Sequence, residues 1–377
     1  MNIDYIHFYV KDARACCHWF VNYMGFRVLA TGVSNHTYTI ALKSGAVSLI
    51  LSSPLTSVSP VAQFLRLHPP GVADIAFVVS DLEGVMEKAV AYGAKVLQPL
   101  QPQPLAQGGG KWGKIAAWGS LSHTLRKTTV FQGDMGNSPL LSTLFEEGSS
   151  TKGFTQQQSS PGKWPGELTA NCELFAEIDH MVLNVPSGNL EQALSWYEKI
   201  LGFQRQQQFM IETGQSGLHS QVLVHPASGV KLPINEPTSA NSQIQEFIDF
   251  NRGAGIQHIA LLTPKIVQAI AQLRILGLSF LPIPPSYYSQ LQQNLEELPL
   301  STTELEEIAA QQILVDWQEE SSAALLLQIF TQPIFPEPTF FFELIERRQD
   351  AQGFGEGNFR ALFEAIEREQ MKRGTLM

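Results

Sequence analysis

Residues 178–203 read IDHMVLNVPSGNLEQALSWYEKILGF. The segment Ile178–Asn184 is an apolar run, partly β-branched, that is too short for a helix and indicates a β-strand. After a loop, the apolar residues recur with helical spacing as far as Gly202, and glycine is suited to ending a helix. This stretch therefore predicts a strand followed by an amphipathic helix.

The same order of features occurs three more times. Residues 3–26 (IDYIHFYVKDARACCHWFVNYMGF) also begin Ile-Asp, carry a Trp before an aromatic residue, and end Gly-Phe. Residues 71–97 (GVADIAFVVSDLEGVMEKAVAYGAKVL) match residues 255–281 (GIQHIALLTPKIVQAIAQLRILGLSFL), and strand-rich segments such as 220–226 (SQVLVHP) follow. Four such units in two halves predict an α+β fold of tandem βαβββ modules, arranged as two paired-module domains.

Three predicted strands in the second half each carry one potential metal ligand. His180 lies in the first strand, His258 in residues 256–262 (IQHIALL), and Glu343 in residues 339–345 (TFFFELI). Two histidines and one carboxylate on separate strands match the facial triad of non-haem Fe(II) oxygenases, which leaves coordination positions open. A carboxylate after three phenylalanines would be costly to bury without a partner.

Each of these residues also has a structural alternative. A single histidine in an apolar strand is more often a hydrogen-bonded core residue than a ligand. Asp179 could cap or pair locally, and Arg347 is near enough in sequence to pair with Glu343.

The internal repeat favours the metal interpretation over these alternatives. Both halves have similar packing requirements, yet the two histidines and the glutamate occur together only in the second half. The aligned residues of the first half are Tyr5 for His180, Asp74 for His258 and, in a weaker alignment, Gln132 for Glu343. We therefore predict one metal-bearing half and one half that has no such site.

Further motifs give the second half a specific resemblance. They are Ser216-Gly-Leu-His-Ser220, Leu232-Pro-Ile-Asn-Glu-Pro237, Gly255-Ile-Gln-His258, Leu327-Gln-Ile-Phe330 and Gly353-Phe-Gly-Glu-Gly-Asn-Phe359. With the paired modules and the triad, they resemble the vicinal oxygen chelate superfamily. Within it, the chain resembles the 4-hydroxyphenylpyruvate dioxygenase family over nearly its whole length. The last motif opens a predicted helix over residues 358–372, which fits the C-terminal gating helix of that family.

The resemblance implies a role for each matching position. His180, His258 and Glu343 match the ligands of one Fe(II) per chain, with O2 as co-substrate, and Phe354 and Phe359 match aromatic residues that sandwich the substrate ring. The positions that match the substrate pocket are Ser220, Pro233, Asn235, Gln257, Gln328, Phe330, Phe341, Phe354, Asn358 and Phe359. Aromatic faces and a few neutral hydrogen-bonding groups are what a phenolic ring requires.

Several pocket positions have simpler interpretations as well. Asn358 is well suited to be the N-cap of the last helix, and Pro233 could mark a strand edge. The helical spacing of Phe359, Leu362, Phe363 and Ile366 is that of an ordinary core-facing stripe. His219 stands where many relatives have Asn, so the polar network beside Ser220 is expected to differ.

The family resemblance implies a reaction. A 2-oxo acid, 4-hydroxyphenylpyruvate, and O2 would give homogentisate and CO2 by oxidative decarboxylation, ring hydroxylation and side-chain migration. Hydroxymandelate synthase shares the fold, ligands and substrate but hydroxylates the benzylic carbon. An extradiol catechol dioxygenase fits the C-terminal motifs poorly, and a non-catalytic binding protein would take up no O2. Zinc could occupy the same ligand set, since ligands alone do not select the metal.

Composition agrees with a cytoplasmic enzyme. The chain has 377 residues, a net charge of −10 and no basic stripe for nucleic acid. It has neither an apolar run near ~20 residues nor a leader, which argues against membrane insertion, and its 3 cysteines argue against a disulfide framework. We expect a metal-free domain over 1–147, a linker over 148–170 and a catalytic domain over 171–377. By resemblance, we also expect a homodimer or homotetramer.

Overall fold

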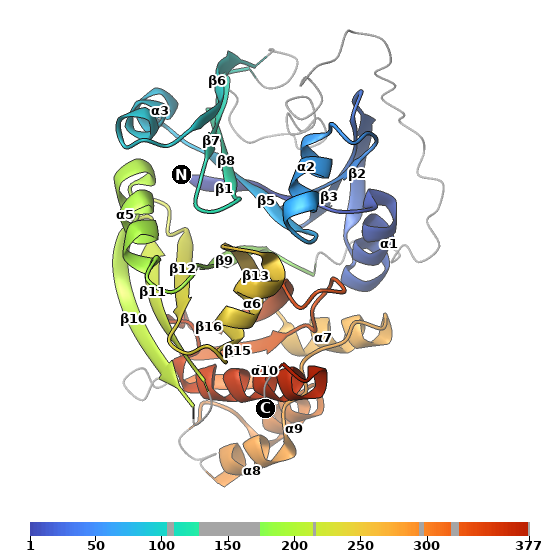
Figure 1. Ribbon diagram of the computed structural model, residues 1–377. Helices are drawn as coiled ribbons and strands as arrows, with labels where there is room; N and C mark the ends of the chain where they lie inside the picture. The colour runs from blue at the N-terminus through green and yellow to red at the C-terminus, as the bar shows by residue number, and fades with distance from the viewer. Residues whose placement is uncertain (104–108, 128–173, 214–215, 294–297, 318–323, 376–377) are drawn as a thin grey trace.

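The strands form two eight-stranded sheets that lie one above the other in Figure 1. In the computed structural model, the described residues are 1–103, 109–127, 174–213, 216–293, 298–317 and 324–375. The strand order is β2-β3-β4-β1-β5-β8-β7-β6 in the first sheet and β10-β11-β12-β9-β13-β16-β15-β14 in the second. Because the two orders correspond strand by strand, the predicted tandem βαβββ architecture is confirmed.

The first half contains two βαβββ units joined by a short helix. Its elements are β1 (Asn2–Tyr9), α1 (Ala13–Met24), β2 (Arg27–Val33), β3 (Thr37–Ser44), β4 (Val47–Pro54), α2 (Pro60–Leu67), β5 (Gly71–Val78), α3 (Leu82–Ala91), β6 (Val96–Pro102), β7 (Lys111–Ala116) and β8 (Ser122–Lys127).

The second half repeats this plan and adds helices after α7 and at the C-terminus. Its elements are β9 (Glu177–Asn184), α5 (Leu190–Leu201), β10 (Gln204–Glu212), β11 (Gly217–Val224), β12 (Lys231–Pro237), α6 (Gln243–Asn251), β13 (Gly255–Leu262), α7 (Ile266–Ile275), α8 (Pro285–Gln293), α9 (Thr302–Ala310), β14 (Leu314–Trp317), β15 (Leu325–Phe330), β16 (Phe341–Arg348), the 3-10 turn η4 (Glu356–Asn358) and α10 (Phe359–Arg373).

The repeated Gly-Phe motif marks the same turn in both halves. Gly25 and Gly202 follow α1 and α5 with φ of 70° and 75°, a left-handed conformation that glycine adopts without steric cost. The phenylalanines that follow, Phe26 and Phe203, are both buried. The turn therefore ends each helix and returns the chain to the core.

The three middle strands of the second sheet bring distant segments together. Ala260 of β13 pairs with His180 of β9 on one side and with Glu343 of β16 on the other. His258 lies two residues before Ala260, on the same face of β13, because side chains alternate along a strand. Strand pairing therefore gathers His180, His258 and Glu343 on one face of the sheet.

The two halves share one apolar core. Phe8 of β1 packs edge-on against Phe340 at 5.0 Å between ring centroids, and Phe20 of α1 against Phe342 of β16 at 5.9 Å. The side chains of Phe340 and Phe342 are almost fully buried. The face of β16 opposite Glu343 is therefore held against the first half.

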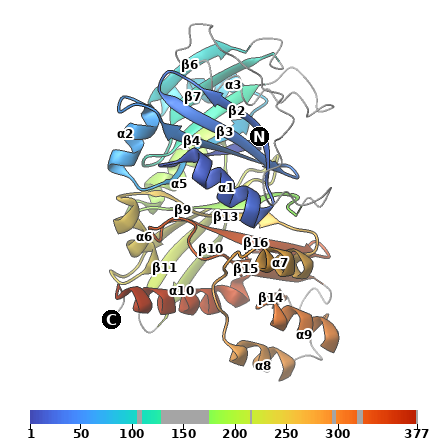
Figure 2. The same ribbon diagram turned by 90° about the vertical axis from the view of Figure 1, so that its right-hand side faces the viewer.

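The terminal helix α10 runs along the second sheet on the side away from the first half, as Figures 1 and 2 both show. Its bounds agree with the helix predicted over residues 358–372 to within one residue. Its buried Phe363 packs with Leu218 of β11 and Ile244 of α6. The helix thus covers the side of the sheet that carries the candidate ligands.

One alignment made from the sequence is wrong. In the parallel pairing of β5 with β8, Ala76 lies opposite Thr124, just as Ala260 lies opposite Glu343. Thr124, and not Gln132, therefore corresponds to Glu343. Gln132 itself and the predicted linker over 148–170 lie outside the described residues.

No helix in the described part of the chain is both long and apolar enough to span a membrane.

Candidate metal centre and binding pocket

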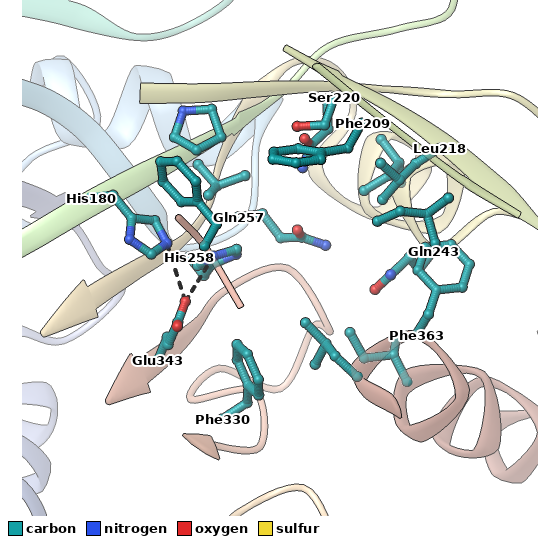
Figure 3. Close-up of a pocket in the computed structure, with 18 of the residues that line it drawn as sticks. His180, Phe209, Leu218, Ser220, Gln243, Gln257, His258, Phe330, Glu343 and Phe363 are labelled. Atoms are coloured by element: carbon teal, nitrogen blue, oxygen red, sulfur yellow. Dashed lines mark ion pairs between the residues drawn. The ribbon is translucent and has the colours of Figure 1, made fainter. Parts of the chain in front are cut away.

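His180, His258 and Glu343 converge in the interior. Nε2 of His180 lies 3.1 Å from Oε2 of Glu343, and Nε2 of His258 lies 3.6 Å from the same oxygen. The two imidazole rings are 5.7 Å apart and nearly perpendicular, at 78°. All three side chains are buried. Figure 3 shows the Glu343 carboxylate reaching toward both rings at one end of a pocket.

The spacing of these three side chains fits a single metal ion. The potential ligand atoms all lie within 4.8 Å of one another. Ligands about 2.1 Å from a first-row metal, at right angles to each other, are themselves roughly 3 Å apart. The donor set of two imidazoles and one carboxylate leaves one face of an octahedral ion open for exogenous ligands. His180, His258 and Glu343 could therefore hold such an ion without a large rearrangement.

Asp179 orients the first histidine. Nδ1 of His180 donates to Oδ2 of Asp179 at 2.8 Å, so Nε2 faces the other ligands. Arg347 holds that carboxylate with two hydrogen bonds, Nε to Oδ1 at 2.7 Å and Nη2 to Oδ2 at 2.8 Å. Lys231 adds a longer contact at 3.4 Å. Carboxylates in this position fix the tautomer and orientation of histidine ligands in metal sites.

The electrostatics of the three side chains are coupled. Burial opposes charge on His180, but the Glu343 and Asp179 carboxylates outweigh it and raise the pKa of His180 to about 9. Burial likewise opposes ionisation of Glu343, but the adjacent histidines lower its pKa to about 2. Burial lowers the pKa of His258 despite the nearby carboxylate. Without a metal, one imidazolium and one carboxylate therefore form a buried ion pair, and a metal ion would displace the imidazolium proton.

The pocket extends from these residues between the sheet and α10, with a volume of about 80 Å³. Nearly all pocket positions implied by the family resemblance line it. These are Ser220, Pro233, Asn235, Gln257, Gln328, Phe330, Phe341 and Phe354. Figure 3 places Gln243 and Phe363 at the end away from the ligands. The lining is mostly apolar and holds a few neutral hydrogen-bonding groups.

Two phenylalanines pack against the histidines. Phe341 stacks on His258 with ring centroids 4.9 Å apart and planes at 18°. Phe354 meets His180 edge-on at 5.2 Å. Their rings restrict the imidazoles and also form walls of the pocket. Phe359 begins α10, and its predicted contact with a ring is not tested because its side chain is not among those described.

A chain of amides supports the carboxylate ligand. Nε2 of Gln328 donates to Oε1 of Glu343 at 3.1 Å, which leaves Oε2 facing the histidines. Nδ2 of Asn358 donates to Oε1 of Gln328 at 3.0 Å, and the Tyr287 hydroxyl donates to Oδ1 of Asn358 at 2.8 Å. A Cβ at Gly355 would overlap the Gln328 amide, so the backbone can pass this close to Gln328 only with glycine at position 355.

This network decides between the alternatives for Asn358. Asn358 occupies the N-cap position of α10, but its side chain makes no capping hydrogen bond. The side chain instead links the start of the helix to Gln328. Similarly, Arg347 pairs with Asp179, which leaves Glu343 to the histidines.

Sequence reasoning missed part of the pocket. The period-two pattern of β10 and β11 could have indicated Phe209, Ile211 and Leu218, which line it beside Ser220. The helical spacing on α10 is also that of an ordinary core-facing stripe, and in the structure its Leu362, Phe363 and Ile366 line the pocket. No local signal marks Tyr287, whose role depends on how α8 packs. Beside Ser220, His219 contacts Gln208 at 2.7 Å on the other face of the strand.

Each half of the chain is similar to the same superfamily of proteins. A model of the glyoxalase/bleomycin resistance protein/dioxygenase superfamily matches residues 177–295, and a second model with the same description matches residues 4–111. The two matches fall on the two halves of the chain, and each begins in the first strand of its sheet.

Curated relatives match nearly the whole chain. The 4-hydroxyphenylpyruvate dioxygenase of Yarrowia lipolytica is 36% identical, over 99% of this chain and 93% of its own length. That of Coccidioides posadasii is 35% identical, over 99% and 94%. Among solved structures, a triple mutant of 4-hydroxymandelate synthase from Streptomyces coelicolor matches with a TM-score of 0.79 and 26% identity, over 98% of each chain.

Proposed function

This chain belongs to the 4-hydroxyphenylpyruvate dioxygenase family, within the glyoxalase/bleomycin resistance protein/dioxygenase superfamily, and from that premise we propose that it converts 4-hydroxyphenylpyruvate and O2 to homogentisate and CO2. The observation that carries the proposal is a buried His-His-Glu cluster at the end of an apolar pocket that contains only a few neutral polar groups. The reaction balances as one substrate molecule and one O2 giving one homogentisate and one CO2.

We assign His180, His258 and Glu343 as the ligands of one Fe(II). When bound, this ion would supply the redox chemistry, with O2 as oxidant and the 2-oxo acid as the source of two electrons. Gln328 donates to Oε1 of Glu343, so Oε2 is the oxygen that would face a bound ion. Asp179 holds the proton on Nδ1 of His180 and so presents Nε2.

The rest of the pocket would position the ring of the substrate. Phe341 and Phe354 supply aromatic walls near the ligands, and Ser220, Gln243 and Gln257 supply neutral hydrogen-bonding groups for a phenolic hydroxyl. Among the described lining residues, the only titratable groups are the three ligands, so no separate acid or base acts on the ring. α10 excludes water with Leu362, Phe363 and Ile366.

A pocket of this kind could also direct the reaction to a different product. The structural match to a mutant of a protein named 4-hydroxymandelate synthase, at 26% identity, supports hydroxymandelate as the alternative product. The relatives named 4-hydroxyphenylpyruvate dioxygenase, at 35% and 36% identity over almost the full chain, favour homogentisate as the product.

The experiment is a product analysis. The protein is loaded with Fe(II) without oxygen, mixed with 4-hydroxyphenylpyruvate, and exposed to O2, and the products are identified by chromatography and mass spectrometry. We expect homogentisate and CO2 in equal amounts, with matching O2 consumption. Formation of hydroxymandelate would agree with the same metal ligands, but it would mean that the pocket directs hydroxylation to the benzylic carbon. No O2 uptake by folded, iron-loaded protein would contradict the proposal and favour a binding protein.

A further inference from the structure

The first half contains a cavity of its own. It has a volume of about 190 Å³, compared with about 80 Å³ for the pocket beside His180. It lies between strands β1, β3, β4, β7 and β8 and helix α2. His36 at the turn between β2 and β3 is exposed, whereas Thr39, Ser52 and Thr124 deeper in the cavity are buried. The cavity is therefore open to solvent at one end and polar at the other.

Strand register shows that this cavity is the counterpart of the pocket in the second half. Thr39 pairs with Ser52, just as Ser220 pairs with Asn235, and all four residues line their respective cavities. Thr124, in the position of Glu343, also lines the first cavity. Duplication has thus preserved a hollow at the same place in both halves.

The chemistry of the first cavity is different. The first two metal-ligand positions are filled by Tyr5 and Asp74, and Lys114 projects from β7 at the position of Phe330. The Lys114 ammonium lies 3.6 Å from Oδ1 of Asp74. Lys114 lines the cavity, whereas its counter-ion Asp74 does not, so the cavity presents the ammonium group, which disfavours a metal cation and can donate to an anionic ligand group.

A buried polar atom of the cavity wall indicates that the ligand brings a hydrogen-bonding group as well. His7, which lines the cavity, is 5% exposed, and its Nδ1 has no hydrogen-bond partner among the described residues. Its Nε2 is 2.8 Å from Oγ of Ser52, which in turn lies 2.7 Å from Oγ1 of Thr39. Buried polar atoms are rarely left without a hydrogen bond.

Burial lowers the pKa of His7 to about 3, and the Lys114 charge contributes to this shift. The imidazole is therefore neutral and offers one donor and one acceptor. The cavity combines a positive charge, a neutral imidazole and several hydroxyl groups, and lacks the facing phenylalanines of the other pocket.

We propose that the cavity in the first half binds a small aliphatic carboxylate that carries several hydroxyl groups. The carboxylate lies against Lys114, and the hydroxyl groups hydrogen bond to His7, Thr39 and Ser52. Trp112 and Val61 supply the limited apolar wall for the carbon chain. This site is separate from the pocket proposed for the aromatic substrate, so the two proposals can fail independently.

D-gluconate is a suitable probe, and isothermal titration calorimetry on the iron-loaded protein is the measurement. Sorbitol lacks the carboxylate, and hexanoate lacks the hydroxyl groups. We expect gluconate to bind one-to-one and at least roughly tenfold more tightly than either analogue, because only gluconate offers both a carboxylate to Lys114 and hydroxyl groups to the neutral polar groups. Crystals soaked with gluconate should show it in this cavity.

Substitutions in the cavity test whether gluconate binds to these residues. The double substitution Asp74→Asn/Lys114→Met removes both members of the ion pair, so no lone buried charge remains, and gluconate affinity should fall by roughly tenfold or more. Thr39→Val, which removes only one hydroxyl group, should cause a smaller loss. Lys111→Met on the same strand is the control, because the Lys111 side chain is 53% exposed and pairs with Glu83.

Three results would overturn the proposal. The first is no gluconate binding by folded protein up to about 50 mM, a concentration well above that expected for a specific site. The second is equal affinity for gluconate and sorbitol. The third is unchanged affinity in both cavity variants, with melting temperatures confirming that they are folded. None of these measurements requires turnover or 4-hydroxyphenylpyruvate.

Discussion

Arg347 forms its bidentate ion pair with Asp179, at 2.7 Å and 2.8 Å, and not with Glu343 four residues earlier in the chain. The two residues come from the opposite ends of the second half, on β16 and β9. Asp179 also accepts a hydrogen bond from His180, so the ion pair connects Arg347 to the first candidate ligand. Burial opposes ionisation of Asp179, but Arg347 and His180 hold its pKa well below the ordinary value.

Replacing Asp179 should weaken metal binding. In Asp179→Asn, His180 loses its charged partner, and we expect the affinity for Fe(II) to fall by about 10- to 100-fold. Anaerobic competition with a chelator measures the affinity. Arg347 and Lys231 also lose their carboxylate, so the assay must run well below the melting temperature. Glu191→Gln, at an exposed carboxylate, serves as the control. Wild-type affinity for Fe(II) in folded Asp179→Asn would show that Asp179 does not support the metal site.

Tyr287 should affect turnover without affecting the metal. Its hydroxyl donates to Asn358 and accepts from the Val315 amide, so Tyr287→Phe loosens the link from Gln328 to the start of α10. We expect unchanged Fe(II) affinity, a loss of kcat of roughly tenfold, and a loss of about 1–2 kcal/mol in the free energy of unfolding.

The neighbouring tyrosine provides the control for this experiment. The Tyr288 hydroxyl donates to the carbonyl of Ile313 and does not reach Asn358. Tyr288→Phe should therefore cost similar stability and leave kcat near wild type. Equal losses of kcat in both variants would mean that the effect is general destabilisation.

Glu367 should determine how firmly α10 covers the pocket. It is 5% exposed and accepts from the hydroxyl groups of Thr213 and Ser216, each at 2.6 Å. In Glu367→Ala the two hydroxyl groups lose a charged acceptor, and we expect KM for the 2-oxo acid to rise roughly tenfold with Fe(II) affinity unchanged.

Glu369→Ala is the matched control on the same helix, because the ion pair of Glu369 is with Lys372, three residues later on α10 itself. Alanine preserves helix propensity in both variants. Steady-state kinetics with saturating Fe(II) separates the two substitutions. An unchanged KM in Glu367→Ala would contradict a role for this contact in substrate binding.

His123 should make the fold sensitive to acid. Burial lowers its pKa from 6.5 to about 4, and its Nε2 lies 3.2 Å from the Tyr197 hydroxyl of the second half. The unfolded imidazole takes up a proton before the folded one does, so stability falls as the pH drops from about 7 to about 4, by about 3 kcal/mol. Below the folded pKa this contribution levels off.

Urea unfolding at several pH values measures this dependence. His123→Gln should make the profile less steep between these limits without flattening it, because burial also lowers the pKa of His7, to about 3. His18→Gln, at an exposed histidine, should leave the wild-type profile unchanged. A profile that is as steep in His123→Gln as in wild type would assign the acid sensitivity to other groups.

Much of the architecture could be predicted from the sequence, because the repeated pattern is local. The strand-helix-glycine units at 3–26 and 178–203 depend on side-chain periodicity and on glycine at the helix end, and both are readable within about 25 residues. His180, His258 and Glu343 were identified in the same way, since each stands out in an apolar strand and the first half lacks all three.

The remaining features depend on strand register and on packing between segments that are distant in the sequence. The parallel pairing of β5 with β8 makes Thr124 the counterpart of Glu343, and no local pattern sets that register. Asn358 looked like a helix cap, yet the approach of α8 and β15 turns its side chain to Tyr287 and Gln328. The cavity beside His7 and Lys114 likewise cannot be predicted from one segment, because its walls come from several strands and a helix that meet only in the folded chain.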